Sequence, residues 1–411
     1  MQTVALHPGF LEHALNPSLT TSLKTAAIDW RLTLMAGVLV AIAITFNILS
    51  GGIFLSPENL YNIAQQTAVV GIVSTVVVLV IVARHIDLSV GSVMGFVGVT
   101  IATLQYSAGW TWYEASLAGL AVGIAVSMYQ GALTAVLGVP SFVVTLGGLM
   151  SFRGAAFLVA DGKTQPVSDK FFLSLGGGYD GAIGATASWA VAALMSAVLI
   201  WMQVAKRRAK QMHGVPNNPA WLDALLTLVP VAIVLAFAAS MNAYSIPNKG
   251  APQGIPVPVL IWAATALGLS FLVHRTRFGR YVFAMGGNPE AAALVGIPVR
   301  RVTLMLFALL GVLITLAAVV SVARLNAGTN SLGTSMELYV IAAAVIGGTA
   351  LAGGSGSILG SVLGALIMQS IDSGMLLLDV SIGLRYVIIG QVLIAAVVFD
   401  VLYRKLTGDT A

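Results

Sequence analysis

The chain has 411 residues, of which 58% are hydrophobic and 9% are charged, whereas soluble domains carry about 25% charged residues. So few polar side chains cannot cover a core of this size, which excludes an ordinary water-soluble protein and predicts that membrane lipid surrounds the fold. The net charge of +5 lies in short basic clusters between apolar runs, which indicates membrane topology rather than a nucleic-acid partner, and the absence of Cys excludes disulfides and Cys-ligated metals.

Apolar runs of about 20 residues, the length that crosses a bilayer, follow one another along the chain. The first is long enough to be a membrane span, and no cleavable signal peptide is evident before it. We predict an all-α, polytopic membrane helical bundle with about 10–12 transmembrane helices. One or two of them are expected to be broken or re-entrant, because several runs are short or rich in Gly. The candidate spans are 32–50, 66–83, 88–106, 115–137, 141–160, 188–204, 223–241, 257–273, 302–322, 336–352, 356–372 and 384–403.

The distribution of Lys and Arg predicts the orientation of these spans. If the N-terminus is cytoplasmic, the inside segments hold 14 of the 20 basic residues, the outside segments hold five, and Arg153 lies within a span. Basic residues concentrate on the cytoplasmic side of membrane proteins. The sequence therefore predicts a cytoplasmic tail at 1–31, one transmembrane domain at 32–403, a cytoplasmic tail at 404–411, and a periplasmic segment at 161–187.

Small residues at four-residue spacing predict where helices approach closely. Helix packing is favoured over a pore-lining role for both runs that show this spacing. The first run is Gly119, Gly123, Ser127 and Gly131, and the second is Gly356, Gly360 and Gly364.

The residues that enzymes use are scattered. No H-E-x-x-H pattern exists, and the Gly162-Lys163-Thr164 stretch lacks the first Gly of a phosphate-binding loop, since Phe157 stands there. We therefore expect no catalytic residue, no metal site and no bound cofactor on this chain.

Charged residues within spans are costly and tend to face the protein interior or a water path. Arg153 is the deepest of them, and interior pairing or function is weighed equally against a structural role. Asp372 and Glu337 lie near span ends, where reaching the interface also explains them. Asp87 begins a span, and an N-cap or local ion pair is the favoured interpretation. The candidates for the translocation path or the interior are Asp87, Ser89, Arg153 and Asp372.

The inside loop 274–301 carries helix signals. Asn288 is a good N-cap, Pro289 suits the first helical position, and Glu290 places negative charge near the helix start. Gly296 provides a stop. The pattern predicts a helix of about two turns on the cytoplasmic face. It lies on lipid headgroups or docks on a protein, and its Ala-rich composition favours a protein partner.

This loop, GRYVFAMGGNPEAAALVGIPVRRV, resembles the cytoplasmic coupling loop of permease subunits in bacterial ABC importers for monosaccharides of the ribose and xylose type. Three further stretches are similar to the same family: HIDLSVGSVMGF at 85–96, VPSFVVTLGGLMSFRGAAF at 139–157 and GGTALAGGSGSILGSVLGALIM at 347–368. The resemblance runs in order from about 60 to 403. Two spans inserted at about 188–245 have no counterpart in the shorter ribose-type members, which favours the xylose branch.

The resemblance implies the ABC importer permease fold in the bacterial inner membrane, a homodimer, and import of a monosaccharide, with a pentose such as xylose favoured. It also implies a cytoplasmic ATP-binding subunit that carries ATP and Mg and docks on the short helix, and a periplasmic sugar-binding protein. The implied coupling residues are Gly286, Gly287, Asn288, Pro289, Glu290, Ala291, Ala292, Ala293, Leu294 and Gly296.

Two alternatives stay open. An ion-coupled secondary sugar transporter should show several intramembrane acidic residues, and few are present. An intramembrane enzyme should show clustered His, Asp or Ser, and none is visible.

Overall fold

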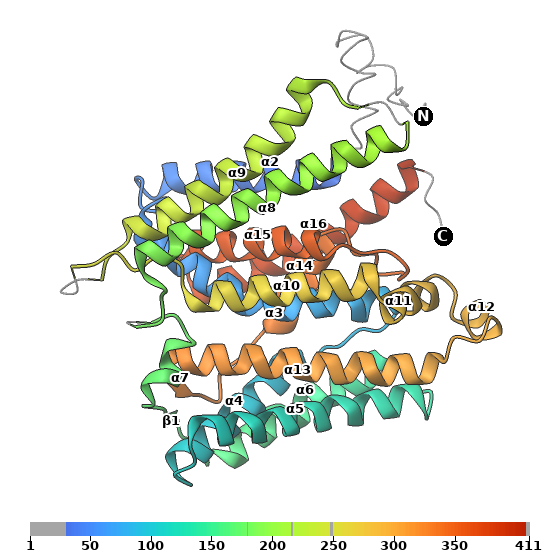
Figure 1. Ribbon diagram of the computed structural model, residues 1–411. Helices are drawn as coiled ribbons and strands as arrows, with labels where there is room; N and C mark the ends of the chain where they lie inside the picture. Colours follow the sequence, from blue (N-terminus) through green and yellow to red (C-terminus); the bar gives the residue numbers. More distant parts are fainter. Residues whose placement is uncertain (1–29, 179, 215–216, 247–249, 408–411) are drawn as a thin grey trace, which may run out of the picture.

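The computed structural model describes residues 30–178, 180–214, 217–246 and 250–407 (Figure 1). Residues 1–29 of the predicted N-terminal tail and 408–411 of the predicted C-terminal tail lie outside these ranges. The predicted start of the C-terminal tail at 404 is too early, because the last helix continues to Thr407. The longer helices are α2 (Trp30–Leu49), α3 (Pro57–Val82), α4 (Val90–Tyr106), α5 (Trp112–Ala135), α6 (Ser141–Val159), α8 (Gly184–Met212), α9 (Ala220–Ala243), α10 (Val257–Arg275), α13 (Val299–Leu325), α15 (Ile358–Leu377) and α16 (Ile382–Thr407). The shorter elements are β1 (Gln165–Pro166), α7 (Lys170–Ser174), α11 (Arg277–Gly287), α12 (Pro289–Leu294), β2 (Ala327–Gly328) and α14 (Met336–Ile346).

Each predicted span is a helix, so the all-α fold is confirmed. Within the described ranges, ten helices are long and apolar enough to cross a membrane, and α4 and α14 are shorter apolar helices. The expectation of a broken helix fits α14, which has 11 residues. The predicted end of that span at 352 is wrong, because the chain leaves the helix at Gly347 and turns through Gly348 at φ +96°.

The predicted start of α3 at residue 66 is also too late. Ser56 is the N-cap and accepts a hydrogen bond from the Asn59 amide, and Pro57 occupies the first helical position. An apolar window misses these polar first turns, whereas the capping residues mark them.

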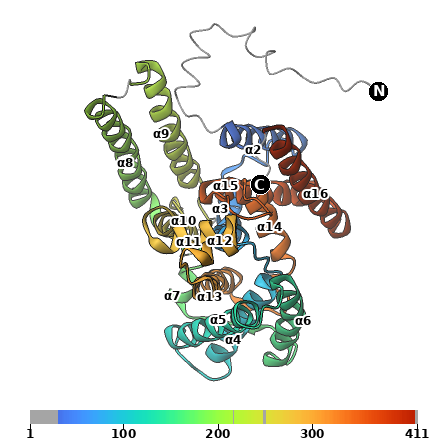
Figure 2. The same ribbon diagram turned by 90° about the vertical axis from the view of Figure 1, so that its right-hand side faces the viewer.

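Helix α3 forms the centre of the bundle (Figures 1 and 2). It packs against α10, α13, α14 and α15, and 94% of its most apolar stretch is buried. Its sequence is apolar on every face rather than on one stripe, as expected for a helix enclosed by others. Helices α2 and α16 show the opposite, since 6% of the corresponding stretch of each is buried.

The small-residue run on α5 packs against neighbouring helices, as predicted. A Cβ on Gly123 would collide with Thr315 and the Gly311 carbonyl of α13, and one on Gly131 would collide with Phe307. These positions allow α5 and α13 to approach closely along much of their length.

The second run is only partly as predicted. Gly360 and Gly364 of α15 face the backbone carbonyls of Gly347 and Ala343 and leave no room for a side chain. Gly356 does not share their helical face, because α15 begins at Ile358 with Ser357 as its N-cap. Ser357 accepts a hydrogen bond from the Gly360 amide and so ends the preceding turn at that point.

The predicted insertion at 188–245 corresponds to α8 and α9. These helices pack mainly on one another and stand at the edge of the bundle, as Figure 2 shows. Helix α9 also contacts α3.

The two ends of the bundle gather different segments (Figure 1). At one end β1 pairs antiparallel with β2, which joins the predicted periplasmic segment 161–187 to the end of α13. At the other end Arg31 forms an ion pair with Asp400 at 2.7 Å, and Arg84 contacts α11. The predicted cytoplasmic segments therefore share one end of the bundle, while the side of the membrane on which that end lies stays a prediction.

Candidate functional site

The short helix predicted in the inside loop is α12. The Asn288 side chain accepts a hydrogen bond from the Ala291 amide at 3.0 Å. At the other terminus the amides of Ile297 and Gly296 donate to the carbonyls of Ala292 and Ala293, each at 3.0 Å, and Gly296 has φ +86°. This is the double hydrogen bond of a helix that ends in a left-handed glycine. Both predicted caps are present.

Helix α12 presents an apolar tip. The side chain of Ala292 is buried against the bundle, whereas Leu294 is 89% exposed and Val295 is 78% exposed. Large apolar side chains that stand beyond the ends of the spanning helices mark a contact with a protein partner or with lipid.

Helix α11, which precedes α12, is not among the helices that the sequence predicts. Thr276 is the N-cap and accepts from the Gly279 amide at 3.3 Å. The buried residues of α11 are Gly279, Val282, Met285 and Gly286. Their helical spacing was the signal that could have identified this element.

Arg84 joins the α11–α12 corner to the end of α3. Its Nε donates to the Gly286 carbonyl at 2.6 Å and its Nη2 donates to the Gly287 carbonyl at 2.5 Å. The Gly354 amide donates to the Val82 carbonyl at 2.9 Å, which brings the loop between α14 and α15 to the same point. A guanidinium at the last carbonyls of a helix is favourable in both charge and hydrogen bonding. Gly286 and Gly287, the first two predicted coupling residues, therefore bind Arg84 through their backbone carbonyls.

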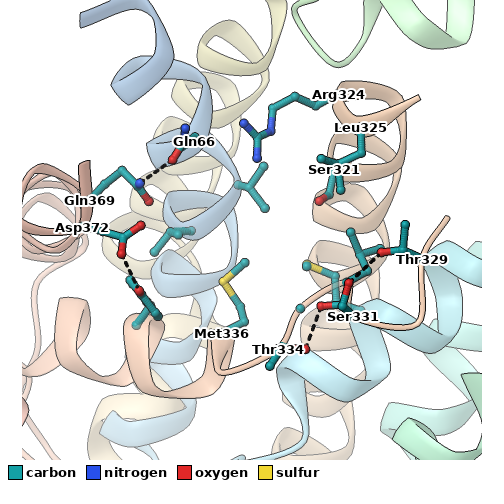
Figure 3. A pocket seen from close by; sticks show the side chains of 16 residues that line it. Gln66, Ser321, Arg324, Leu325, Thr329, Ser331, Thr334, Met336, Gln369 and Asp372 are labelled. Atoms are coloured by element: carbon teal, nitrogen blue, oxygen red, sulfur yellow. Dashed lines mark hydrogen bonds between the residues drawn. The ribbon is translucent and has the colours of Figure 1, made fainter. Parts of the chain in front are cut away.

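A cavity of about 290 Å³ lies toward the opposite end of the bundle, among α3, α4, α13, α14 and α15 (Figure 3). We call it the outer cavity. Its apolar lining comes from Val69, Val70, Met94, Leu325, Leu332 and Met336. Its polar lining comes from Gln66, Ser321, Arg324, Thr329, Ser331, Thr334, Tyr339, Gln369 and Asp372.

Several polar groups of the outer cavity hold one another in place. The Gln369 amide donates to the Gln66 carbonyl oxygen at 2.6 Å. Asp372 accepts from Tyr339 at 2.9 Å and forms an ion pair with Arg385 at 2.6 Å. Of the four sequence candidates for the path, Asp372 alone lines this cavity. Its hydrogen bond to Tyr339 and its ion pair with Arg385, both half-buried, show that it does more than reach the interface.

Arg153 lies behind one wall of the outer cavity. Its Nη1 donates to the Asn330 carbonyl at 3.1 Å and to the Leu332 carbonyl at 2.8 Å. It holds the loop that carries the hydroxyl groups of the cavity, which is the structural one of the two interpretations that the sequence left open.

Asp87 and Ser89 lie away from the outer cavity. Asp87 accepts from the Ser89 amide and hydroxyl, each at 2.7 Å, and Gln130 donates to the Ser89 hydroxyl at 2.9 Å. The favoured interpretation of Asp87 is half right: it satisfies an amide before α4, but Ser89 occupies the N-cap position. Within the described part of the chain Asp87 has no ion pair, and no three metal-binding side chains cluster.

Comparison with known proteins gives one family. The model for the branched-chain amino acid transport system / permease component family matches residues 59–397. The chain is 35% identical over 374 residues to the xylose transport system permease protein XylH of Escherichia coli K12, which covers 91% of this chain and 92% of the relative.

Two further relatives agree with this match. The chain is 36% identical over 383 residues to XylH of Haemophilus influenzae, covering 93% of this chain and 99% of the relative. It is 31% identical over 350 residues to the ribose import permease protein RbsC of Escherichia coli K12, covering 84% and 87%. No solved structure matches significantly. The helical bundle, the capped loop and these matches together show that the chain belongs to the family of branched-chain amino acid transport system permease components, among its monosaccharide permeases of the ribose and xylose type.

Proposed function

We propose that this chain is the membrane-spanning subunit of an ATP-driven importer of a pentose such as xylose. The relatives named for xylose transport match it over nearly their whole length, which supports the substrate. The chain acts as a transport subunit, and a separate cytoplasmic subunit binds ATP with Mg. The ion-coupled alternative has less support, since two of the few acidic residues of the spanning helices, Asp372 and Asp400, are each held in an ion pair with Arg.

The coupling loop carries the proposal. Helix α12 is capped at both ends, exposes Leu294 and Val295, and is joined to α3 through Arg84. A rigid, capped element transmits displacement better than a flexible linker of equal length. The ATPase subunit docks on residues 286–296, and its movement reaches the transmembrane helices through this corner.

The assembly follows from the same proposal. Two copies of the chain pair in the bacterial inner membrane with both termini in the cytoplasm, and a periplasmic sugar-binding protein docks at the end that holds β1, β2 and α7. The sugar enters at that end and leaves toward α12.

Reconstitution tests the proposal. The chain, its ATPase and its binding protein are placed in liposomes, and uptake of labelled xylose is measured with ATP, without ATP, and with an ionophore that abolishes ion gradients. We expect uptake that requires ATP and is unaffected by the ionophore. Uptake that proceeds without ATP and stops with the ionophore would establish the secondary transporter instead.

A further inference from the structure

Arg324 is a half-buried cation in the last turn of α13. Its Nε is buried and has no hydrogen-bond acceptor within the described ranges. The other cations near the outer cavity are paired, Arg385 with Asp372 and Arg153 with two carbonyls. A charge in a membrane domain usually faces a partner or a water path. Arg324 takes the second option, since Figure 3 shows its guanidinium pointing into the outer cavity toward Gln66 and Gln369.

The position of Arg324 at the end of α13 offers a simpler explanation. Cations in the last turn of a helix are stabilised by the negative end of the helix dipole. Such a side chain would normally hydrogen-bond the last carbonyls of its own helix. Among the described residues Arg324 makes no such bond, and its donors remain available to a ligand in the cavity.

The wall opposite Arg324 offers fixed donors and acceptors. The Gln369 amide donates to the Gln66 carbonyl oxygen, which leaves the Gln66 amide hydrogens and the Gln369 carbonyl oxygen available. The charge of Asp372 is already compensated by Arg385. The cavity therefore presents one uncompensated cation among neutral amides and hydroxyls.

The loop wall adds hydroxyl groups in a defined arrangement. Thr334 donates to the Ser331 carbonyl at 2.7 Å, and the hydroxyls of Thr329 and Ser331 lie 3.2 Å apart. Arg153 holds this loop from behind through the Asn330 and Leu332 carbonyls. Val69, Val70 and Met94 supply apolar surface between these polar walls. Alternating polar walls and apolar patches suit a small ring that carries many hydroxyl groups.

We propose that the outer cavity is a transit subsite for a neutral monosaccharide, in which Arg324 donates to two neighbouring hydroxyl oxygens while the Gln66–Gln369 pair binds hydroxyls on the other side of the ring. The volume of about 290 Å³ lies at the lower limit of small-molecule pockets, about 300–1,000 Å³, and therefore suits one small ring. The planar fork of a guanidinium matches two adjacent oxygens. This inference rests on the proposed function and assigns its path to named residues.

The first test compares uptake of labelled xylose by the complete importer with wild-type chain, Arg324→Gln, Arg324→Lys and Lys206→Gln. Lys206 is an exposed cation of α8, outside the outer cavity and outside both proposed docking surfaces, and serves as the control. A hydrogen bond to a charged group that is lost in transit lowers the maximal rate by about tenfold or more. We expect this loss in Arg324→Gln, partial recovery in Arg324→Lys, and wild-type uptake in Lys206→Gln. The half-saturating sugar concentration stays unchanged, because the binding protein sets it.

A purely structural role gives a different result. Wild-type uptake by Arg324→Gln overturns the proposal, and so does a loss of uptake that is accompanied by loss of the copurifying ATPase. If the wild-type importer takes up no xylose, the proposed function fails instead, and the second test below still examines the cavity.

The second test uses Arg324→Cys, since the chain has no other Cys. The reaction of this thiol with a methanethiosulfonate reagent is followed in the purified chain with xylose, other neutral pentoses and hexoses, xylonate or a non-carbohydrate osmolyte. We expect a neutral monosaccharide to slow the reaction and the osmolyte to leave it unchanged. Slowing by xylonate alone, or by none of these compounds, overturns the assignment of a neutral sugar.

Discussion

The substitution Ala292→Pro tests the coupling loop most directly. Ala292 is the first residue of α12 whose amide bonds a backbone carbonyl, that of Asn288, at 3.0 Å. Pro removes this hydrogen bond and its ring collides with the same carbonyl, at a cost of about 3 kcal/mol in a helix interior. A helix of six residues has little stability of its own to offset this cost.

The size of the expected effect follows from that cost. If the ATPase docks on helical α12, a loss of about 3 kcal/mol lowers the docking-competent population about 100-fold. We expect the ATPase to fall from the copurified complex and xylose uptake to fall with it. The spanning helices do not contain residue 292, so membrane insertion and yield should match wild type.

Glu290→Pro is the matched control. It introduces the same residue in the first turn of α12, where the backbone amide has no intrahelical acceptor. The control removes the Glu290 side chain from the docking surface and the favourable charge at the helix start, about 0.3–1 kcal/mol, but it keeps the helix. A larger defect in Ala292→Pro than in this control therefore reports the loss of helical structure. A full complement of ATPase and normal uptake in Ala292→Pro would refute the assignment of 286–296 as the coupling element.

Three further predictions concern the bundle. Arg153→Leu should release the loop at Asn330 and Leu332 and lower the free energy of unfolding by about 2–3 kcal/mol. Uptake should fall while the ATPase still copurifies. A thermal denaturation curve and an uptake rate equal to those of wild type would refute this role. Gly364→Leu should force α15 away from Ala343 and lower the free energy of unfolding by about 1–3 kcal/mol. The control, Gly268→Leu on α10, should be tolerated, because a Cβ at that position meets no atom. Equal yields of the two variants would contradict the packing argument. For topology, a Cys at exposed Lys163 should react with an impermeant reagent in intact cells, and a Cys at Leu294 should react only after permeabilisation; the reverse pattern would invert the orientation.

The sequence predicts the elements of this fold well where the signal is local. Apolar length identifies the twelve spanning or half-spanning helices of the described ranges, and the caps at Asn288 and Gly296 identify α12. Helix boundaries are less accurate, because Ser56 and Ser357 set them through hydrogen bonds that an apolar window ignores. Gly356 was placed on a helix for the same reason.

The sites depend on contacts that a single sequence does not reveal. Arg84 and Gly286 are 202 positions apart, and Gln66 and Gln369 are 303 apart. The sequence distinguishes Arg324 in no way from the other four basic residues of the predicted outside segments. Only the packing of α3, α13 and α15 shows that it lines a cavity. Periodicity and capping are local properties, whereas a cavity is a property of how distant helices pack.

The enclosure of α3 has a mechanical consequence. Its inner end is tied to the coupling corner through Arg84, and its outer half carries Gln66, Val69 and Val70 on the wall of the outer cavity. An α-helix of 26 residues is a rod of about 39 Å whose length is fixed by its hydrogen bonds. Because neighbouring helices, among them α10, α13, α14 and α15, pack against it, such a rod would tilt more readily than it would slide past them all. A lateral displacement of α3 at Arg84 would then move Gln66 in the opposite direction. A single helix would thus connect the ATPase-binding end of the protein to the outer cavity.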